Sequence, residues 1–208
     1  MDPVVADVRF ALVRQWELIS EVVDAIDLAA ASRCNGWTNR EVLAHLYVQP
    51  HLVEKFLGTA SVRQAHVRLS ENLAGAKSFS ELINDSARKG AILNKVELRS
   101  PLAAVRDVVL AAPLDATITT LQGEISVSDY LVTRCVEAVV HGSDLVPPVT
   151  PDPVAEAVTS NALLQVLEVS APQLVEEAQA LPTDRWIGLA TGRAKATGSL
   201  AEAMPVMA

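Results

Sequence analysis

Residues 128–145 read SDYLVTRCVEAVVHGSDL, a pattern that predicts one long amphipathic helix. At 100° per residue, one arc of this segment collects apolar side chains, including Leu131 and Val139, and the other arc collects polar ones. Capping groups precede the segment, and four prolines within residues 146–153 end it. Such a helix must bury its apolar arc against other helices, so a helical bundle is the expected fold.

The polar arc of the same segment carries residue types that bind metal ions. Glu137 and His141 are four residues apart, and this spacing lets a carboxylate oxygen and an imidazole nitrogen reach one ion from a single helix face. Tyr130 and Arg134 lie within about 60° of them on a helix. A metal site and an ordinary solvated face are both compatible with this pattern.

A second helix is predicted to begin at Thr38, because Thr38 and Glu41 have the T-x-x-E spacing of a capping box. His45 on this helix is the natural third ligand, since metal sites in bundles use inward side chains of facing helices. A core histidine bonded to a backbone carbonyl is the alternative. Pro50 is expected to kink the helix near its middle.

Other segments are predicted from their periodicity and capping groups. A long first helix is expected within residues 4–30, and another from the S-x-x-E start at Ser78 to about residue 96. Ser100 and Pro101 resemble the start of a further helix. Residues 117–120 and 124–127 flank Gln122-Gly123 with β-branched side chains, which favours a small hairpin or an extended link.

The proline-rich segment divides the chain into three predicted parts: a main helical domain (1–145), a linker (146–153) and a small appendage (154–208). In the appendage, residues 154–180 are expected to be mostly helical with a break at Pro172, and residues 186–190 to form a short strand. The predicted fold class is mainly α, with a small mixed α/β C-terminal appendage.

Composition and charge narrow the functional classes. The chain has 208 residues, of which 50% are hydrophobic, and a formal net charge of −8 without a basic stripe, so nucleic-acid binding is excluded. No export signal or membrane-spanning apolar run is present, which predicts a cytoplasmic protein without a membrane partner. Cys34 and Cys135 lie far apart in sequence and are expected to be reduced thiols.

Two motifs resemble a known family. Residues 36–46, GWTNREVLAHL, and residues 134–145, RCVEAVVHGSDL, resemble the two signature helices of the mycothiol-dependent maleylpyruvate isomerase family. That family belongs to the DinB-like metal-binding bundles, so the resemblance implies a DinB-like four-helix bundle. It also implies that His45, Glu137 and His141 bind a divalent metal, most simply zinc. Three protein ligands leave a coordination position open, which suits catalysis better than a structural role.

The tail adds a shorter resemblance. Residues 189–193, LATGR, are similar to the Gly-Arg ending of related proteins that are partly sterol-carrier-like. In the isomerases a tail arginine helps the active site, which implies such a role for Arg193. Arg134 shares the polar face of Glu137 and His141, and it can hold a carboxylate through two parallel hydrogen bonds or form an internal salt bridge.

These observations predict a metal-dependent enzyme that uses a low-molecular-weight thiol on a small electrophilic substrate. The metal would stabilise the thiolate as nucleophile, for isomerisation or thiol transfer, and the resemblance implies mycothiol as the thiol. Cys34 in a loop and Cys135 on the apolar face are poor nucleophiles. Two alternatives remain: a metal-dependent hydrolase and a non-catalytic, sterol-carrier-like protein that binds a small molecule.

Overall fold

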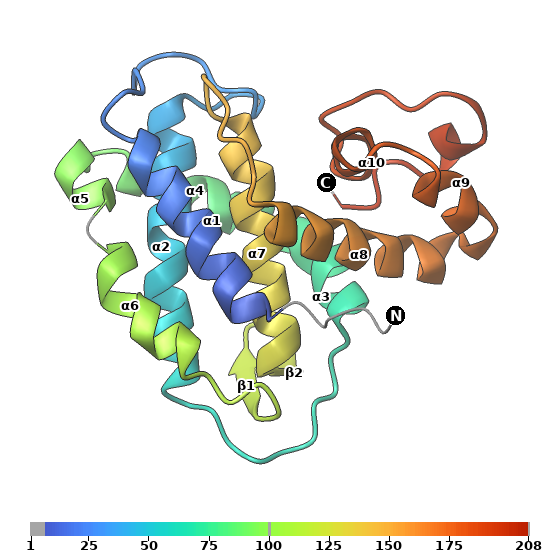
Figure 1. Cartoon of the computed structure of the whole chain (residues 1–208), viewed down its shortest axis with the longest axis horizontal. Coiled ribbons are helices and arrows are strands. Elements are labelled where there is room, and N and C mark those ends of the chain that lie inside the picture. The colour runs from blue at the N-terminus through green and yellow to red at the C-terminus, as the bar shows by residue number, and fades with distance from the viewer. Residues whose placement is uncertain (1–6, 100, 208) are drawn as a thin grey trace.

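The structure is a computed structural model that describes residues 7–99 and 101–207. Within these residues, a bundle is formed by α1 (Val8–Val22), α2 (Asn39–Leu57), α6 (Pro101–Leu110) and α7 (Val127–Asp144). Each of these helices contacts two others of the bundle, and α1 lies against α7 as α2 lies against α6 (Figure 1). The predicted mainly helical fold is therefore confirmed.

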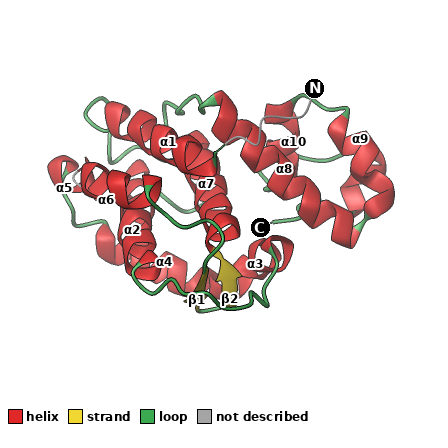
Figure 2. Cartoon of the chain, turned by 60° about the horizontal axis from the view of Figure 1, so that its bottom comes forward, coloured by secondary structure: helices red, strands yellow, loops and turns green. Residues whose placement is uncertain are grey.

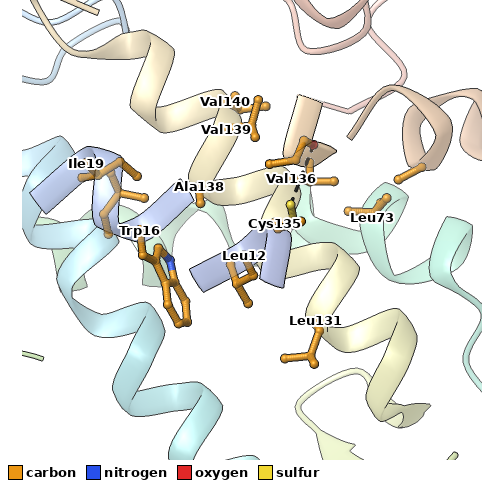
Figure 3. Close-up of a cluster of buried hydrophobic side chains, with 14 of the residues drawn as sticks. Leu12, Trp16, Ile19, Leu73, Leu131, Cys135, Val136, Ala138, Val139 and Val140 are labelled. Atoms are coloured by element: carbon orange, nitrogen blue, oxygen red, sulfur yellow. Dashed lines mark hydrogen bonds between the residues drawn. The ribbon is translucent and has the colours of Figure 1, made fainter. Parts of the chain in front are cut away.

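The core forms where the apolar arcs of α1 and α7 meet. Leu12, Trp16 and Ile19 project from successive turns of α1 toward α7, where Leu131 is among the buried side chains they face (Figure 3). Gly142 allows the two helices to approach closely, because a Cβ atom there would lie 3.2 Å from the Gln15 side chain. Burial of this periodic apolar face is what holds α7 in the bundle.

Helix α2 begins as the capping box predicts. Oε2 of Glu41 accepts hydrogen bonds from the backbone nitrogen of Thr38 at 2.6 Å and from its hydroxyl at 2.9 Å. The helix continues through Pro50 to Leu57. The first helix is shorter than predicted, since α1 ends at Val22, and residues 1–6 lie outside the described residues.

The single helix predicted from Ser78 to residue 96 is wrong, because α4 (Ser80–Gly90) ends at Gly90 and a separate helix, α5 (Lys95–Arg99), begins at Lys95. Before α4, the chain forms α3 (Leu69–Gly75) and a 3-10 turn (Ala76–Phe79). Helix α4 packs closely on α2 at Gly90, where a Cβ atom would lie 3.1 Å from that of Ala44. Asn94 then starts α5 by accepting from the backbone of Val96 and Glu97. The predicted cap at Ser100 lies outside the described residues.

The predicted hairpin is present. Strands β1 (Thr117–Thr120) and β2 (Gly123–Ser126) pair antiparallel, with Thr117 opposite Ser126 and Thr120 opposite Gly123. Gly123 has a φ of 115°, a conformation that glycine adopts without a Cβ penalty. The hairpin leads directly into α7 and lies beside its first turns (Figure 2).

The described part of the tail consists of helices joined by turns and loops and contains no strand, so the strand predicted at residues 186–190 is wrong. Its elements are α8 (Pro153–Ser170), a 3-10 turn (Pro172–Leu174), α9 (Val175–Gln179), α10 (Thr183–Ala190) and a last 3-10 turn (Gly198–Glu202). Trp186 and Ala190 are buried one helical turn apart, and the Trp186 indole donates to the Ser160 carbonyl on α8 at 3.2 Å. Packing on α8 therefore selects the helix. The predicted break at Pro172 is confirmed.

The tail contacts the bundle through α8, which packs on α7, α3 and α1. Helices α8, α9 and α10 lie on one side of the bundle (Figure 2). The connecting residues 146–153 are hydrogen-bonded to the bundle. The backbone N–H of Val146 donates to the side-chain oxygen of Asn39, and the backbone N–H of Asp152 donates to the side-chain oxygen of Gln15, each at 2.9 Å. The division into a bundle, a linker and an appendage stays a prediction. Across residues 7–99 and 101–207, no helix has the length and apolar character needed to cross a membrane.

Candidate metal centre

The three predicted ligands meet inside the bundle. Helix α2 supplies His45, and α7 supplies Glu137 and His141 from successive turns. Oε2 of Glu137 lies 2.9 Å from Nε2 of His45 and 3.6 Å from Nε2 of His141. One ligand atom from each residue lies within 4.8 Å of the other two. Two ligands of a tetrahedral zinc ion are separated by about 3.3 Å, so the spacing fits such an ion.

The electrostatics of the cluster also suit a cation. Burial alone would raise the pKa of Glu137, but the hydrogen bond from His45 and the nearby charges of His141 and Arg134 hold it well below its ordinary value. Burial lowers the pKa of His45, which is only 5% exposed, against the opposing effect of Glu137. An ionised carboxylate and a neutral imidazole are the forms in which these side chains bind zinc.

The ring of His141 is held from two sides. Its Nδ1 lies 2.9 Å from Oδ2 of the fully buried Asp144, which leaves Nε2 directed to the cluster. The Trp37 indole stacks on the His141 ring, with 5.9 Å between the ring centroids. The indole Nε1 of Trp37 donates to the amide oxygen of Asn84 at 2.8 Å. A carboxylate behind a histidine is the usual outer support of a metal ligand, and it fixes the tautomer of that histidine.

The tail arginine reaches this support. Arg193 donates from Nε to Oδ1 of Asp144 at 3.1 Å and from Nη2 to Oδ2 at 2.8 Å. Burial would raise the pKa of Asp144, but the bonds from His141 and Arg193 lower it to about 2. The structure therefore brings Arg193 to the site, where its direct partner is Asp144.

Arg134 lies one turn of α7 before Glu137 and is also connected to the cluster. Its guanidinium donates to the amide oxygen of Gln49, whose amide nitrogen lies 3.3 Å from Nε2 of His45. The sequence alone did not indicate Gln49 or Trp37. Gln49 is four residues after His45, so its place on the same face of α2 was the available signal.

The remaining histidines and cysteines lie around or away from the centre. His51 is exposed and contacts Tyr47, and His66 is exposed and faces Glu124. Cys34 is half-buried and forms a second close group with His141 and Asp144, but the carboxylate of that group is already paired with Arg193. Cys135 is buried, as its place on the apolar arc predicts.

Two cavities meet at the candidate centre, and both are lined by His45 and Glu137. The first has a volume of about 340 Å³ and extends toward the beginning of α7, past Arg134. The second has a volume of about 640 Å³, includes His141, and opens among the polar and charged side chains Arg33, Cys34, Asn35, Lys77, Asn84 and Arg193. The cluster can thus be approached by solutes from two directions.

Comparison with known proteins identifies the family. A family model described as the mycothiol maleylpyruvate isomerase N-terminal domain matches residues 10–146. The chain belongs to this family. The match covers all of the bundle helices except the first two residues of α1, and it includes all three residues of the cluster. No curated protein matches the chain.

Solved structures of similar fold carry the same description. The crystal structure of a mycothiol-dependent maleylpyruvate isomerase is 20% identical, with a TM-score of 0.49, over 75% of this chain and 66% of that one. A histidine-to-alanine mutant of a mycothiol-dependent maleylpyruvate isomerase is 19% identical, with a TM-score of 0.52, over 78% of this chain and 67% of that one. The chain therefore spans about two thirds of the length of these isomerases, and the second likeness supports the DinB-like fold.

The two thiols are expected to differ in reactivity. Burial raises the pKa of Cys135 to about 12. Burial, and to a smaller extent the negative charge of Asp144, also raises the pKa of Cys34. Iodoacetamide should therefore label Cys34 slowly in the native protein and Cys135 only after unfolding in urea, because the thiolate is the reactive form. Mass spectrometry of the labelled peptides measures both rates. Native labelling of Cys135 as fast as that of Cys34 would contradict the burial seen here.

Proposed function

We propose that the chain is a metal-dependent enzyme that uses mycothiol to isomerise a small electrophile or to transfer the thiol to it. The observation that carries the proposal is the cluster of His45, Glu137 and His141 at the meeting point of two cavities. Membership in the mycothiol maleylpyruvate isomerase family supports the choice of thiol and of reaction class. We propose zinc as the metal, because two imidazoles and a carboxylate are a common zinc ligand set.

The three ligands would leave one coordination position open. A bound divalent ion would supply the positive charge that keeps a thiol in its thiolate form at neutral pH. Glu137 would contribute the one negative charge of the ligand set, and His45 and His141 would bind as neutral rings. The site therefore keeps a net positive charge toward an anionic sulfur, and Asp144 holds the ring of His141 in place.

The nucleophile must come from outside the chain. Cys135 is buried on the apolar side of α7. Cys34 lines the same cavity as the cluster, but burial and the charge of Asp144 raise the pKa of its thiol, which disfavours the reactive thiolate. In an isomerisation, the sulfur of mycothiol would form a bond to one carbon of an activated double bond, whose electron pair moves to the activating carbonyl group. Rotation about the resulting single bond and expulsion of the same thiolate regenerate the double bond with the other geometry. In a transfer, the sulfur stays attached and the neighbouring carbon takes up a proton from water, which balances the proton that the thiol lost on becoming a thiolate.

We propose that the two arginines bind or orient the reactants. Arg134 would hold a carboxylate of the substrate or of the thiol, because guanidinium binds carboxylates through two parallel hydrogen bonds. Arg193 lines the second, larger cavity, which we call the polar cavity. Arg193 would act both on Asp144 and on a polar reactant in that cavity. Both arginines are therefore proposed as catalytic residues that contact a reactant.

The test of the proposal uses cobalt in place of zinc. Titration of the cobalt-substituted protein with mycothiol is expected to produce sulfur-to-metal charge-transfer absorption, and H141A should abolish it. The variant H51A, with a histidine removed from the exposed side of α2, should respond like the parent. If mycothiol leaves the spectrum unchanged while an ester or amide is hydrolysed, the protein is a metal-dependent hydrolase instead. If no metal binds at all, the catalytic proposal fails.

A further inference from the structure

The smaller cavity beside the candidate centre has an apolar wall that the proposed reaction does not by itself explain. Helices α2, α3 and α4, the hairpin turn and the first half of α7 surround it. Its apolar lining includes Val48, Leu52, Phe56, Leu73, Phe79 and Ile83. Leu82 and Leu121 also line it and are 56% and 74% exposed, so the cavity is open to solvent beside them.

Its volume sets the size of a ligand. A cavity of about 150 Å³ with apolar walls holds one benzene molecule. The cavity here, at about 340 Å³, is more than twice as large and lies within the range of small-molecule binding sites. An apolar body of about two fused rings would fill it, whereas a small dicarboxylate would leave most of the apolar wall without contacts.

The cavity also holds a positive charge whose hydrogen-bond partners among the described residues are neutral. Arg134 lines it, donates to Gln49 and Thr133, and stacks over the Tyr130 ring at 5.4 Å. Among the described residues, no carboxylate forms an ion pair with this guanidinium. Glu137, one turn away, interacts with this partly buried charge but forms no ion pair with it, so an anionic ligand in the cavity would be the direct partner of the guanidinium.

A second polar group in the same wall lacks a partner. Tyr130 lines the cavity and is 4% exposed, and its buried hydroxyl makes no hydrogen bond to any residue that the structure describes. Buried hydroxyl groups are nearly always hydrogen-bonded, so this one points to a missing acceptor or donor. Arg134 and Tyr130 are one helical turn apart on α7, and one carboxylate group can satisfy both.

The second cavity, on the other side of Glu137, carries more charged groups than the first. Arg33 and Lys77 supply positive charge there beside the Arg193–Asp144 pair, while Trp37, Ile83 and Met207 are among the apolar residues of its wall. Along α7, Arg134 precedes Glu137 and borders the apolar cavity, while His141 follows it and borders the polar one. Two ligands of different chemistry can therefore reach the three-residue cluster at the same time.

We infer that the apolar cavity binds the electrophilic substrate, and that this substrate carries an apolar body of about two rings and one carboxylate held by Arg134 and Tyr130. The polar cavity is then left for the thiol. This inference rests on the proposed function, because it assigns the two reactants of that reaction to the two cavities. It predicts a more apolar substrate than a small dicarboxylate such as maleate.

Binding of 2-naphthoate to the metal-loaded protein tests the inference by titration calorimetry. The structure predicts that 2-naphthoate binds at least about tenfold more tightly than the uncharged 2-naphthalenemethanol, because only the former pairs with Arg134. It should also bind more tightly than maleate, which lacks the apolar body. Equal or tighter binding of maleate would overturn the inference, as would equal binding of the uncharged alcohol.

Variants locate the binding site. R134Q is expected to weaken the binding of 2-naphthoate by about tenfold or more and to leave the binding of the alcohol unchanged. V48W should weaken the binding of both ligands, because the larger side chain fills the cavity. The matched control R88Q removes an exposed arginine from the outer side of α4 and should change neither. Circular dichroism and metal content show whether each variant is folded and loaded. If 2-naphthoate binds to folded, loaded V48W and R134Q as to the parent, the assignment is wrong.

The same samples separate this inference from the proposed function. If cobalt-substituted protein responds to mycothiol but 2-naphthoate does not bind, the cavity assignment fails and the proposed function stands. If 2-naphthoate binds as expected but mycothiol leaves the cobalt spectrum unchanged, both the proposed function and the role of the cavity as the site of a thiol acceptor are overturned. The cavity then belongs to a hydrolase if an ester or amide is turned over, and to a binding protein if none is.

Discussion

The variant E137Q is expected to lose the bound metal, from about one ion per chain in the parent protein to a small fraction of that. Glu137 is the shared neighbour of both histidines, at 2.9 Å from His45 and 3.6 Å from His141. Its carboxylate is also the one negative charge among the three ligands. Loss of an outer-shell partner already reduces metal affinity or activity by about 10–100-fold, so loss of this ligand should reduce thiol-dependent turnover by about 100-fold or more.

Elemental analysis of the purified variant and turnover with mycothiol measure these effects. The controls H51A and H66A each remove an exposed histidine that lies outside the cluster, and both should keep the metal and the activity. Removal of the metal from the parent by a chelator should reproduce the loss seen in E137Q, and added zinc should restore activity to the parent alone. Equal metal content in E137Q and the parent would place the ion elsewhere.

The sequence predicts well those features of the site that depend on residues close together along the chain. Glu137 and His141 lie on one face of α7 because they are four residues apart on a helix, and helix periodicity follows from the residues of that segment. The capping box at Thr38 similarly fixes where α2 begins, and hence which face carries His45. The meeting of α2 and α7 depends on tertiary packing, and it was expected from bundle architecture and from family resemblance rather than from local pattern.

Long-range contacts explain what the sequence did not predict. Asp144 and Arg193 are 49 residues apart and form a bidentate pair only because the tail folds back to the end of α7. The strand predicted at residues 186–190 failed for a related reason. A short apolar run is compatible with a strand or a buried helix, and the choice is made here by the contact of Trp186 with α8.

Removal of the Asp144 charge, which pairs with Arg193, is expected to have a second large effect, on metal affinity and on stability. The variant D144N is expected to lower metal affinity by about 10–100-fold, because His141 loses the anionic partner of its Nδ1. It should also lower the free energy of unfolding of the metal-free protein by about 2–4 kcal/mol. Breaking a buried ion pair costs about 3–5 kcal/mol, and the Arg193 side chain is 26% exposed, which reduces the penalty.

A double-mutant cycle with R193Q separates the two roles proposed for Arg193. If this arginine supports the metal only by orienting Asp144, the variant carrying both changes should bind metal no more weakly than D144N. Because Arg193 also lines the polar cavity, kcat/KM of the double variant should fall about tenfold further than that of D144N when measured with saturating metal.

The matched control for this cycle is R185Q, which removes an exposed arginine of α10 whose guanidinium donates to the backbone carbonyl of Lys195. It should leave metal affinity, urea unfolding and turnover unchanged. Chelator competition, urea denaturation and steady-state kinetics measure the three quantities separately. Additive losses of metal affinity, with no further fall in kcat/KM, would mean that Arg193 supports the ligands independently of Asp144 and does not contact a reactant. The charge of Arg193 would then act on the metal centre as a whole, and the polar cavity would need another group to hold the thiol.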